Sequence, residues 1–301
     1  MIPVSFREEE EKTVNNLYHK LLNIKKHQPN KTAYISNIKA INIWCEKNIV
    51  IDGKSYSFPQ VIQADYDTLL KIVQILNSGV IFPKKYEHFM KDTLYKNRFP
   101  RREFMESLGV TVCPYCNRNF VNKADRRTMC DLDHFFNKDL YPVLAVSFYN
   151  LIPVCHSCNH SKGVQSISYS PHDKRYSTDE LLTFDFYLKG INFLYDEKDI
   201  GVEITEIGKM KKNVKALSLG EVYQIHTDIV QDCIKRTMMF SPEYLNYLYD
   251  SYGNLFESED ELYRTVFGNY IKEKEYGKRP LSKLTADIIK KLFEICYGVD
   301  L

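Results

Sequence analysis

Two Cys-x-x-Cys pairs limit the folding of this 301-residue chain more than any other feature of its sequence. Cys113 and Cys116 form the first pair, and Cys155 and Cys158 form the second. A Cys-x-x-Cys turn holds two thiolates on one short loop, and two such turns supply the four sulfur ligands of a tetrahedral Zn²⁺ site. Because protein atoms would fill all four positions, we expect a structural zinc ion. An iron–sulfur cluster has the same ligands, but no other feature of the sequence indicates electron transfer.

The remaining cysteines and the N-terminus bear on the cellular compartment. The opening sequence MIPVSFREEEEK is unlike a signal peptide, and no apolar run approaches the roughly 18 residues of a membrane span. We therefore expect a cytoplasmic protein without membrane association, in which paired cysteines bind metal rather than form disulfides. Cys45, Cys233 and Cys296 lie in apolar helical patterns, so we expect them to be buried. Cys130 fits neither pair and is expected to be buried outside the zinc site.

The rest of the sequence predicts a mostly helical α+β protein. Hydrophobic residues make up 44% of the chain and charged residues 27%, as in ordinary folded proteins. Apolar residues recur with a helical period through a predicted N-terminal region, residues 1–105, with one helix over 83–99. We place the cysteine-containing module at residues 106–176 and a C-terminal region at 177–301.

Within the C-terminal region the pattern changes from extended to helical. The apolar runs LLTFDFYL, INFLY and VEITEI predict short strands or hairpins, followed by helices. Farther along, Val222, Ile225, Ile229 and Cys233 recur at helical spacing, which predicts that they share one helix.

Two segments concentrate positive charge, although the net charge of the chain is only +2. The basic residues of the first segment, 84–102, are Lys84, Lys85, Lys91, Lys96, Arg98, Arg101 and Arg102. The second segment contributes Lys123, Arg126 and Arg127. Either segment could contact a phosphate backbone, and either could equally be an ordinary solvated surface.

Asp133 and His134 lie next to each other in the sequence CDLDHF, which predicts a strand. Neighbouring side chains on a strand point to opposite faces. We therefore assign them separate roles, in which the carboxylate binds a hard cation and the imidazole acts as a general base. Asn159 follows Cys158 directly, so the second cysteine pair would fix the position of its amide oxygen, which also suits Mg²⁺.

The motif formed by Asp133-His134, Asn150 and Asn159-x-x-Lys162, flanked by the two cysteine pairs, resembles the HNH (ββα-metal) endonucleases. The resemblance implies a β-hairpin and a helix around one Mg²⁺ or Mn²⁺ ion. It implies that His134 is the general base, and that Asp133 and Asn159 bind the ion. It further implies that Asn150 orients the catalytic loop, and that Lys162 contacts phosphate or braces the helix.

Two parts of the sequence are similar to HNH subunits of Septu-type and retron-associated anti-phage systems. They are the pattern DLDHF…NLIPVCHSCN…KG and the segment RPLSKLTADI at 279–288. That similarity implies a DNA endonuclease that acts in defence with an ATPase partner subunit. Two alternatives remain open. One is an RNase of the same fold, and the other is a catalytically inert zinc-ribbon subunit that binds nucleic acid.

Three further residues are candidates for secondary roles near the motif. Asp131 shares a strand face with Asp133, so it is either a metal ligand or a residue that supports one. His156 and His160 flank the second cysteine pair, where they would contact phosphate, replace a ligand or simply be exposed polar residues.

Overall fold

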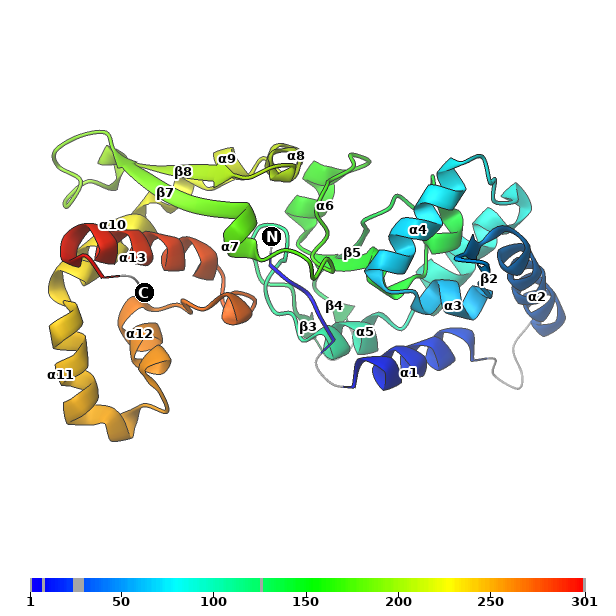
Figure 1. Ribbon diagram of the computed structural model, residues 1–301, viewed down its shortest axis with the longest axis horizontal. Helices are drawn as coiled ribbons and strands as arrows, with labels where there is room; N and C mark the ends of the chain where they lie inside the picture. Colours follow the sequence, from blue (N-terminus) through cyan, green and yellow to red (C-terminus); the bar gives the residue numbers. More distant parts are fainter. Residues whose placement is uncertain (1, 7–8, 24–29, 125–126, 300–301) are drawn as a thin grey trace. The chain divides into compact units, whose positions relative to one another are not determined.

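The computed structural model describes residues 2–6, 9–23, 30–124 and 127–299 (Figure 1). The chain divides into two compact units, each made of segments that are separate in the sequence. Unit 1 comprises Met1–Pro3, Val110–Val121 and Cys155–Leu301, and unit 2 comprises Val4–Gly109 and Asn122–Val154. Helices predominate among the described residues and the strands form two-stranded sheets, which agrees with the expected mostly helical α+β class.

The helices of unit 2 come mainly from the N-terminal third of the chain. Its α-helices are α1 (Glu10–Leu22), α2 (Lys31–Asn48), α3 (Phe58–Gln63), α4 (Tyr66–Asn77) and α5 (Arg101–Leu108). Short polar side chains define two of their starts. Ser57 and Gln60 form a reciprocal capping box at α3, and the Asp65 carboxylate accepts a hydrogen bond of 2.8 Å from the N–H of Thr68 at α4.

The segment 83–99, for which the sequence predicts one helix, contains two short helices of other types. η1 (Lys84–Tyr86) is a 3₁₀-helix, and η2 (Phe89–Lys96) is a π-helix. At the end of η2 the N–H of Asn97 reaches back five residues to the carbonyl of Asp92. The backbone is helical without a break from residue 84 to residue 98, so the prediction of one helix is confirmed, but its turns are of 3₁₀, α and π type in succession.

Antiparallel pairs of short strands complete the described part of unit 2. They are β1 (Val50–Ile51) with β2 (Lys54–Ser55), β3 (Lys123–Ala124) with β4 (Arg127–Thr128), and β5 (Asp131–His134) with β6 (Leu151–Val154). The strand predicted around Asp133 is thus confirmed. The loop 135–150 joins β5 to β6 and contains the 3₁₀-helices η3 (Pro142–Leu144) and η4 (Phe148–Asn150), whose residues are buried.

Unit 1 contains a long β-hairpin and most of the C-terminal helices. Its α-helices are α6 (His156–Lys162), α7 (Thr178–Leu181), α8 (Met210–Ala216), α9 (Leu219–Val222), α10 (Thr227–Met239), α11 (Pro242–Tyr252), α12 (Glu259–Phe267) and α13 (Ser282–Tyr297). Its 3₁₀-helices are η5 (Glu197–Asp199), η6 (Gln224–His226), η7 (Gly253–Leu255) and η8 (Glu273–Glu275). The hairpin pairs β7 (Leu182–Leu188) with β8 (Ile200–Glu206), and α10 and α13 pack together against it (Figure 1).

Two predictions for the C-terminal region are wrong. The run INFLY, 191–195, forms turns between β7 and β8 rather than a strand, and its Ile191 and Tyr195 are 93% and 90% exposed. The helix predicted through Val222 and Cys233 is interrupted, because α9 ends at Val222 and α10 begins at Thr227. The pairing of β7 with β8 leaves residues 191–195 in the connection between the two strands, and a short sequence window does not contain that information.

The cysteines outside the two pairs differ in burial. Cys45 and Cys233 are buried as predicted, whereas Cys296 is exposed, which corrects the expectation for that residue. Cys130 lies outside the paired cysteines and is only partly buried. Among the described residues, no helix combines the length and the apolar character needed to cross a lipid bilayer.

Candidate functional site

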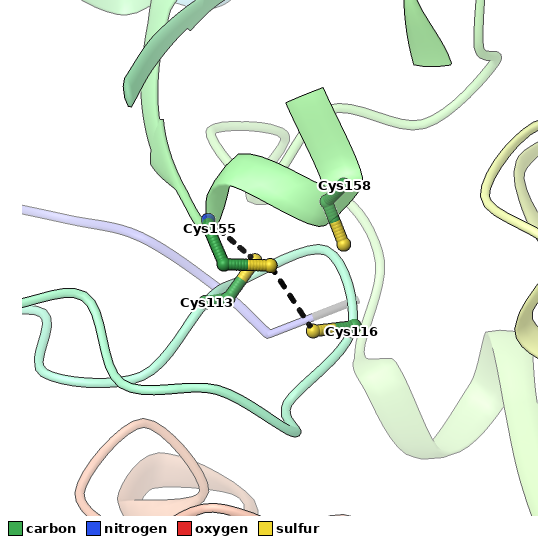
Figure 2. Close-up of side chains that lie close together, drawn as sticks. All are labelled: Cys113, Cys116, Cys155 and Cys158. Carbon is green, nitrogen blue, oxygen red and sulfur yellow. Dashed lines mark hydrogen bonds between the residues drawn. The ribbon is translucent and has the colours of Figure 1, made fainter. Parts of the chain in front are cut away.

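The four paired cysteines converge within unit 1. Their side chains point toward a common centre, and all four sulfur atoms lie within 4.8 Å of one another (Figure 2). The sulfurs of Cys116 and Cys155 are 3.9 Å apart. Ligands at about 2.3 Å from a tetrahedral Zn²⁺ are about 3.8 Å from each other, so the cluster has the dimensions of a zinc site. All four residues are buried, which is typical of a structural site.

Backbone and side-chain donors surround the sulfurs. The N–H of Cys155 donates to Cys113 Sγ at 3.3 Å, the N–H of Arg118 donates to Cys116 Sγ at 3.4 Å, and Asn119 Nδ2 donates to Cys155 Sγ at 3.4 Å. Burial raises the pKa of the Cys113 thiol, whereas the hydrogen bond from Cys113 lowers the pKa of Cys155. Buried thiolates of one charge need a cation among them. This ligand set therefore suits zinc.

Asn117 connects the first cysteine turn to the C-terminal part of unit 1. It has a left-handed backbone with φ of 50°, a conformation that asparagine tolerates better than most residues. Its Nδ2 donates to the carbonyl of Tyr276 at 2.8 Å, and its Oδ1 accepts from the N–H of Lys283 at 3.0 Å. The Tyr223 hydroxyl donates to the carbonyl of Cys116. Sequence reasoning missed Asn117, although an asparagine directly after Cys-x-x-Cys is a signal for a turn.

Asn150 organises the loop 135–150 of unit 2. Its side chain is fully buried, and its Oδ1 accepts a hydrogen bond of 2.7 Å from the N–H of Phe136. Its Nδ2 donates to the carbonyls of Phe136 and Leu144 at 3.1 and 3.0 Å. Its own carbonyl accepts from the N–H of Phe135 at 2.9 Å. One side chain thereby fixes both ends of the loop that follows His134.

His134 is the last residue of β5 and is 6% exposed. Its Nε2 lies 2.9 Å from the carbonyl oxygen of Ala145, within the loop that Asn150 fixes. Because a carbonyl oxygen can only accept, Nε2 carries the proton in this hydrogen bond, and the basic lone pair of the neutral ring is at Nδ1. The ring of Tyr95 packs edge-on against the imidazole, with 4.4 Å between their centroids.

The structure places the predicted cation ligands in different units. Asp133 pairs with Ile152 across the β5–β6 hairpin and is 6% exposed, and Asp131 on the same strand is partly buried. Asn159 and Lys162 lie on α6 in unit 1, where Asn159 is partly buried and Lys162 is 2% exposed. That Asp133 and Asn159 bind one cation therefore stays a prediction from the motif.

The candidate phosphate contacts are placed as follows. Lys123 lies in β3 and Arg127 in β4, whereas Arg126 is outside the described residues. His156 and His160 are exposed on α6.

In the basic segment 84–102 the side chains have different environments. Lys91 pairs with Asp139 at 2.8 Å, whereas Lys84, Lys85, Lys96 and Arg102 are exposed. Part of this segment is therefore available to a polyanion, and part of it has a structural role.

No protein-family model matches the chain, and neither a curated protein nor a solved structure is significantly similar to it. The resemblance to the HNH endonucleases consequently depends on the motif residues alone.

Proposed function

We propose that this protein is a metal-dependent HNH-type endonuclease that hydrolyses phosphodiester bonds in DNA. The observation that supports this proposal most is the arrangement of His134, the carbonyl of Ala145 and Asn150. When a backbone carbonyl accepts the Nε2 proton of a buried imidazole, Nδ1 is the basic nitrogen of the ring before any substrate binds. That is the preparation a general base needs.

In the proposed reaction, His134 Nδ1 removes a proton from the water that attacks phosphorus. Asn150 keeps the Ala145 carbonyl in place, so the imidazole cannot rotate away from the position in which it accepts that proton. The carboxylate of Asp133 and the amide oxygen of Asn159 are the groups that would hold the cation, and oxygen ligands of this kind suit Mg²⁺ or Mn²⁺. Such an ion, when bound, supplies positive charge at the scissile phosphate.

The zinc proposed at the four cysteines has a structural role. Asn159 comes directly after Cys158 on α6, so a metal bound by the cysteines would also restrict the start of that helix. With four sulfur ligands there is no position left at which zinc could bind water. We therefore propose two metal ions with separate roles, a structural Zn²⁺ and a catalytic Mg²⁺ or Mn²⁺.

The direct test is cleavage of supercoiled plasmid DNA by the zinc-loaded protein with and without Mg²⁺ or Mn²⁺. His134→Ala should lower the rate about 10²- to 10⁴-fold, which is the usual contribution of a general base. His19→Ala is the matched control, because His19 is an exposed histidine of α1 in the same unit. Cleavage by His134→Ala at the wild-type rate would contradict the assignment of the base.

Assays on the same zinc-loaded protein distinguish the two alternative functions, a nucleic-acid-binding subunit that does not cleave and an RNase. The four-cysteine cluster is complete without any catalytic residue, and this observation favours a zinc-containing subunit that binds nucleic acid but does not cut it. Binding of DNA or RNA in a mobility-shift assay, with no cleavage under any divalent metal, would support that function. Faster cleavage of RNA than of DNA would instead identify an RNase. A role in anti-phage defence and an ATPase partner stay predictions from the resemblance.

A further inference from the structure

The π-helix η2 contains Tyr95, whose ring packs against His134. A π-helix has more residues per turn than an α-helix, because its hydrogen bonds join residues five apart. Residues five apart in an α-helix point about 140° away from each other around the axis. In η2 the wider turn brings Tyr95 close to the direction of Met90, which is fully buried. π-helical turns are rare and occur frequently at functional sites.

Tyr95 is held in place from several sides within unit 2. Its hydroxyl donates a hydrogen bond of 2.8 Å to the carbonyl of Leu132 on β5, two residues before His134. The guanidinium of Arg101 lies 4.5 Å from the centre of the Tyr95 ring. Burial raises the pKa of Tyr95, so its hydroxyl remains a donor at neutral pH. These contacts restrict the ring to one orientation against the imidazole.

We propose that Tyr95 is a positioning residue for the general base of the proposed nuclease, and that η2 exists in its π-helical form to place it there. This inference rests on the proposed function of His134. The hydrogen bond to Ala145 restrains one edge of the imidazole. The edge-on contact with Tyr95, at 4.4 Å between centroids, adds a restraint on the plane of the ring.

The basic segment 84–102 thereby gains a role that its charge does not indicate. Arg101 packs on the outer side of Tyr95 and holds it in position, instead of serving only as a phosphate contact. The contacts in the series Arg101, Tyr95, His134 all lie within unit 2 and continue into the Ala145 carbonyl. The sequence contains the tyrosine, but an α-helical interpretation of the segment gives it the wrong direction.

The first measurement is independent of nuclease activity. Two-dimensional ¹H–¹⁵N spectra that report imidazole tautomers would be recorded for wild type, Tyr95→Leu and Tyr95→Phe. We expect His134 to have its proton mainly on Nε2 in wild type and Tyr95→Phe, because both retain the ring. Tyr95→Leu should populate the second tautomer or broaden the signal. Tyr86→Leu is the control, since Tyr86 lies in the same segment and its ring packs on Phe82.

The second measurement separates positioning from general stability. In single-turnover cleavage, Tyr95→Leu should lower the maximal rate about 10²-fold, as small displacements of a catalytic group do. The apparent KM should stay within about twofold, because Tyr95 does not bind substrate. Tyr95→Phe should restore most of the rate.

The outcomes distinguish this inference from the proposed function. Unchanged His134 signals in folded Tyr95→Leu would overturn the positioning role, even if the wild-type protein is an active nuclease. If the wild type cuts neither DNA nor RNA, the proposed function fails, and the tautomer spectra still decide the role of Tyr95. If Tyr95→Leu does not fold, Tyr95→Met decides in its place, because it also lacks the ring: an altered His134 tautomer supports the contribution of the ring, and a wild-type tautomer overturns it.

Discussion

The cysteine cluster of unit 1 and the His134 loop of unit 2 are both buried, but different interactions hold them. The cluster collects sulfurs from two separate segments, and side-chain and backbone bonds through Asn117 tie its first turn to residues near α13. The loop is held by hydrogen bonds from one side chain, Asn150, to backbone groups between residues 136 and 144. The cluster therefore has the ligand set of a metal site, whereas the polar groups of the Asn150 side chain are paired with protein atoms.

The two units should therefore lose stability under different treatments. Removal of a metal from the cysteines would break the sulfur–metal bonds that join the two cysteine turns, so unit 1 should lose stability when zinc is chelated. The polar groups that Asn150 satisfies belong to the chain itself, so chelation should not affect them. Single-residue variants test whether unit 1 depends on the metal and whether the Asn150 loop of unit 2 does not.

The largest effect is expected for Cys113→Ser. A hydroxyl does not replace the thiolate as a zinc ligand, so bound zinc should be lost and the free energy of unfolding of unit 1 should fall by about 4 kcal/mol or more. Metal analysis and thermal unfolding measure the two consequences. Cys296→Ser is the control, because Cys296 is exposed and outside the cluster. Well-folded Cys113→Ser protein without zinc would show that unit 1 does not need the metal.

A smaller loss is expected for Lys283→Met. The ammonium of Lys283 lies 2.6 Å from a carboxylate oxygen of Asp179 and 2.6 Å from one of Asp287, and its side chain is 2% exposed. Removal of the charge leaves the buried carboxylate of Asp287 without its cation, which costs about 3 kcal/mol. Lys290→Met is the control, because Lys290 is 3.5 Å from Asp179 and a third exposed, so its loss should cost about 1 kcal/mol or less. Urea unfolding measures the loss in the free energy of unfolding for each variant. Equal losses would mean that the buried charge of Lys283 does not stabilise unit 1 more than an exposed charge does.

Asn150→Ala tests unit 2 in the same way. The variant loses three side-chain hydrogen bonds and leaves the N–H of Phe136 without its acceptor, so we expect a loss of about 2–3 kcal/mol. Its zinc content should equal that of the wild type, in contrast to Cys113→Ser. Asn137→Ala removes one exposed hydrogen bond to the N–H of Asp139 and should cost less than about 1 kcal/mol. Zinc loss in Asn150→Ala would contradict the separation of the two sites.

More of the cysteine cluster than of the His134 loop can be predicted from the sequence. The cysteine ligands are found from spacing alone, because Cys-x-x-Cys is a local geometry that any loop can adopt. The strand that contains Asp133 and His134 is likewise local, and the structure confirms it. The bonds of Asn150 are a different matter, since its partners are backbone groups of Phe136 and Leu144 whose positions depend on the path of the loop.

Residues far apart in the sequence are harder still to predict. Asn117 is joined to Tyr276 and Lys283, and no pattern within a single segment indicates that contact. Tyr95 reaches His134 because η2 is π-helical, and hydrophobic periodicity does not distinguish a π-helix from an α-helix over eight residues. The sequence thus identifies groups with the right chemistry, while the residues that orient them depend on tertiary structure.

The smallest effect is a difference in pH dependence between the two carboxylates that share Lys283. Burial raises the pKa of Asp287, and the charge of Lys283 offsets this only in part. Burial acts in the same direction on Asp179, but the hydrogen bond and charge of Lys283 outweigh it and lower the pKa. A group with a raised pKa contributes stability below its unfolded pKa and loses it as the pH rises, whereas a group with a lowered pKa contributes above that value.

The cost of Asp287→Asn should therefore decrease as the pH rises from about 4 to 7, starting at the ordinary pKa of an aspartate. The cost of Asp179→Asn should change less over the same range, because its folded carboxylate has a lowered pKa and the unfolded one completes its ionisation just above the ordinary aspartate pKa of about 3.9. Urea unfolding of zinc-loaded protein at several pH values measures both costs against wild type, which cancels any common effect of pH on zinc binding. Parallel curves for the two variants would show that the shared ammonium stabilises both carboxylates equally, and the buried charge of unit 1 would then act as one symmetric pair of contacts.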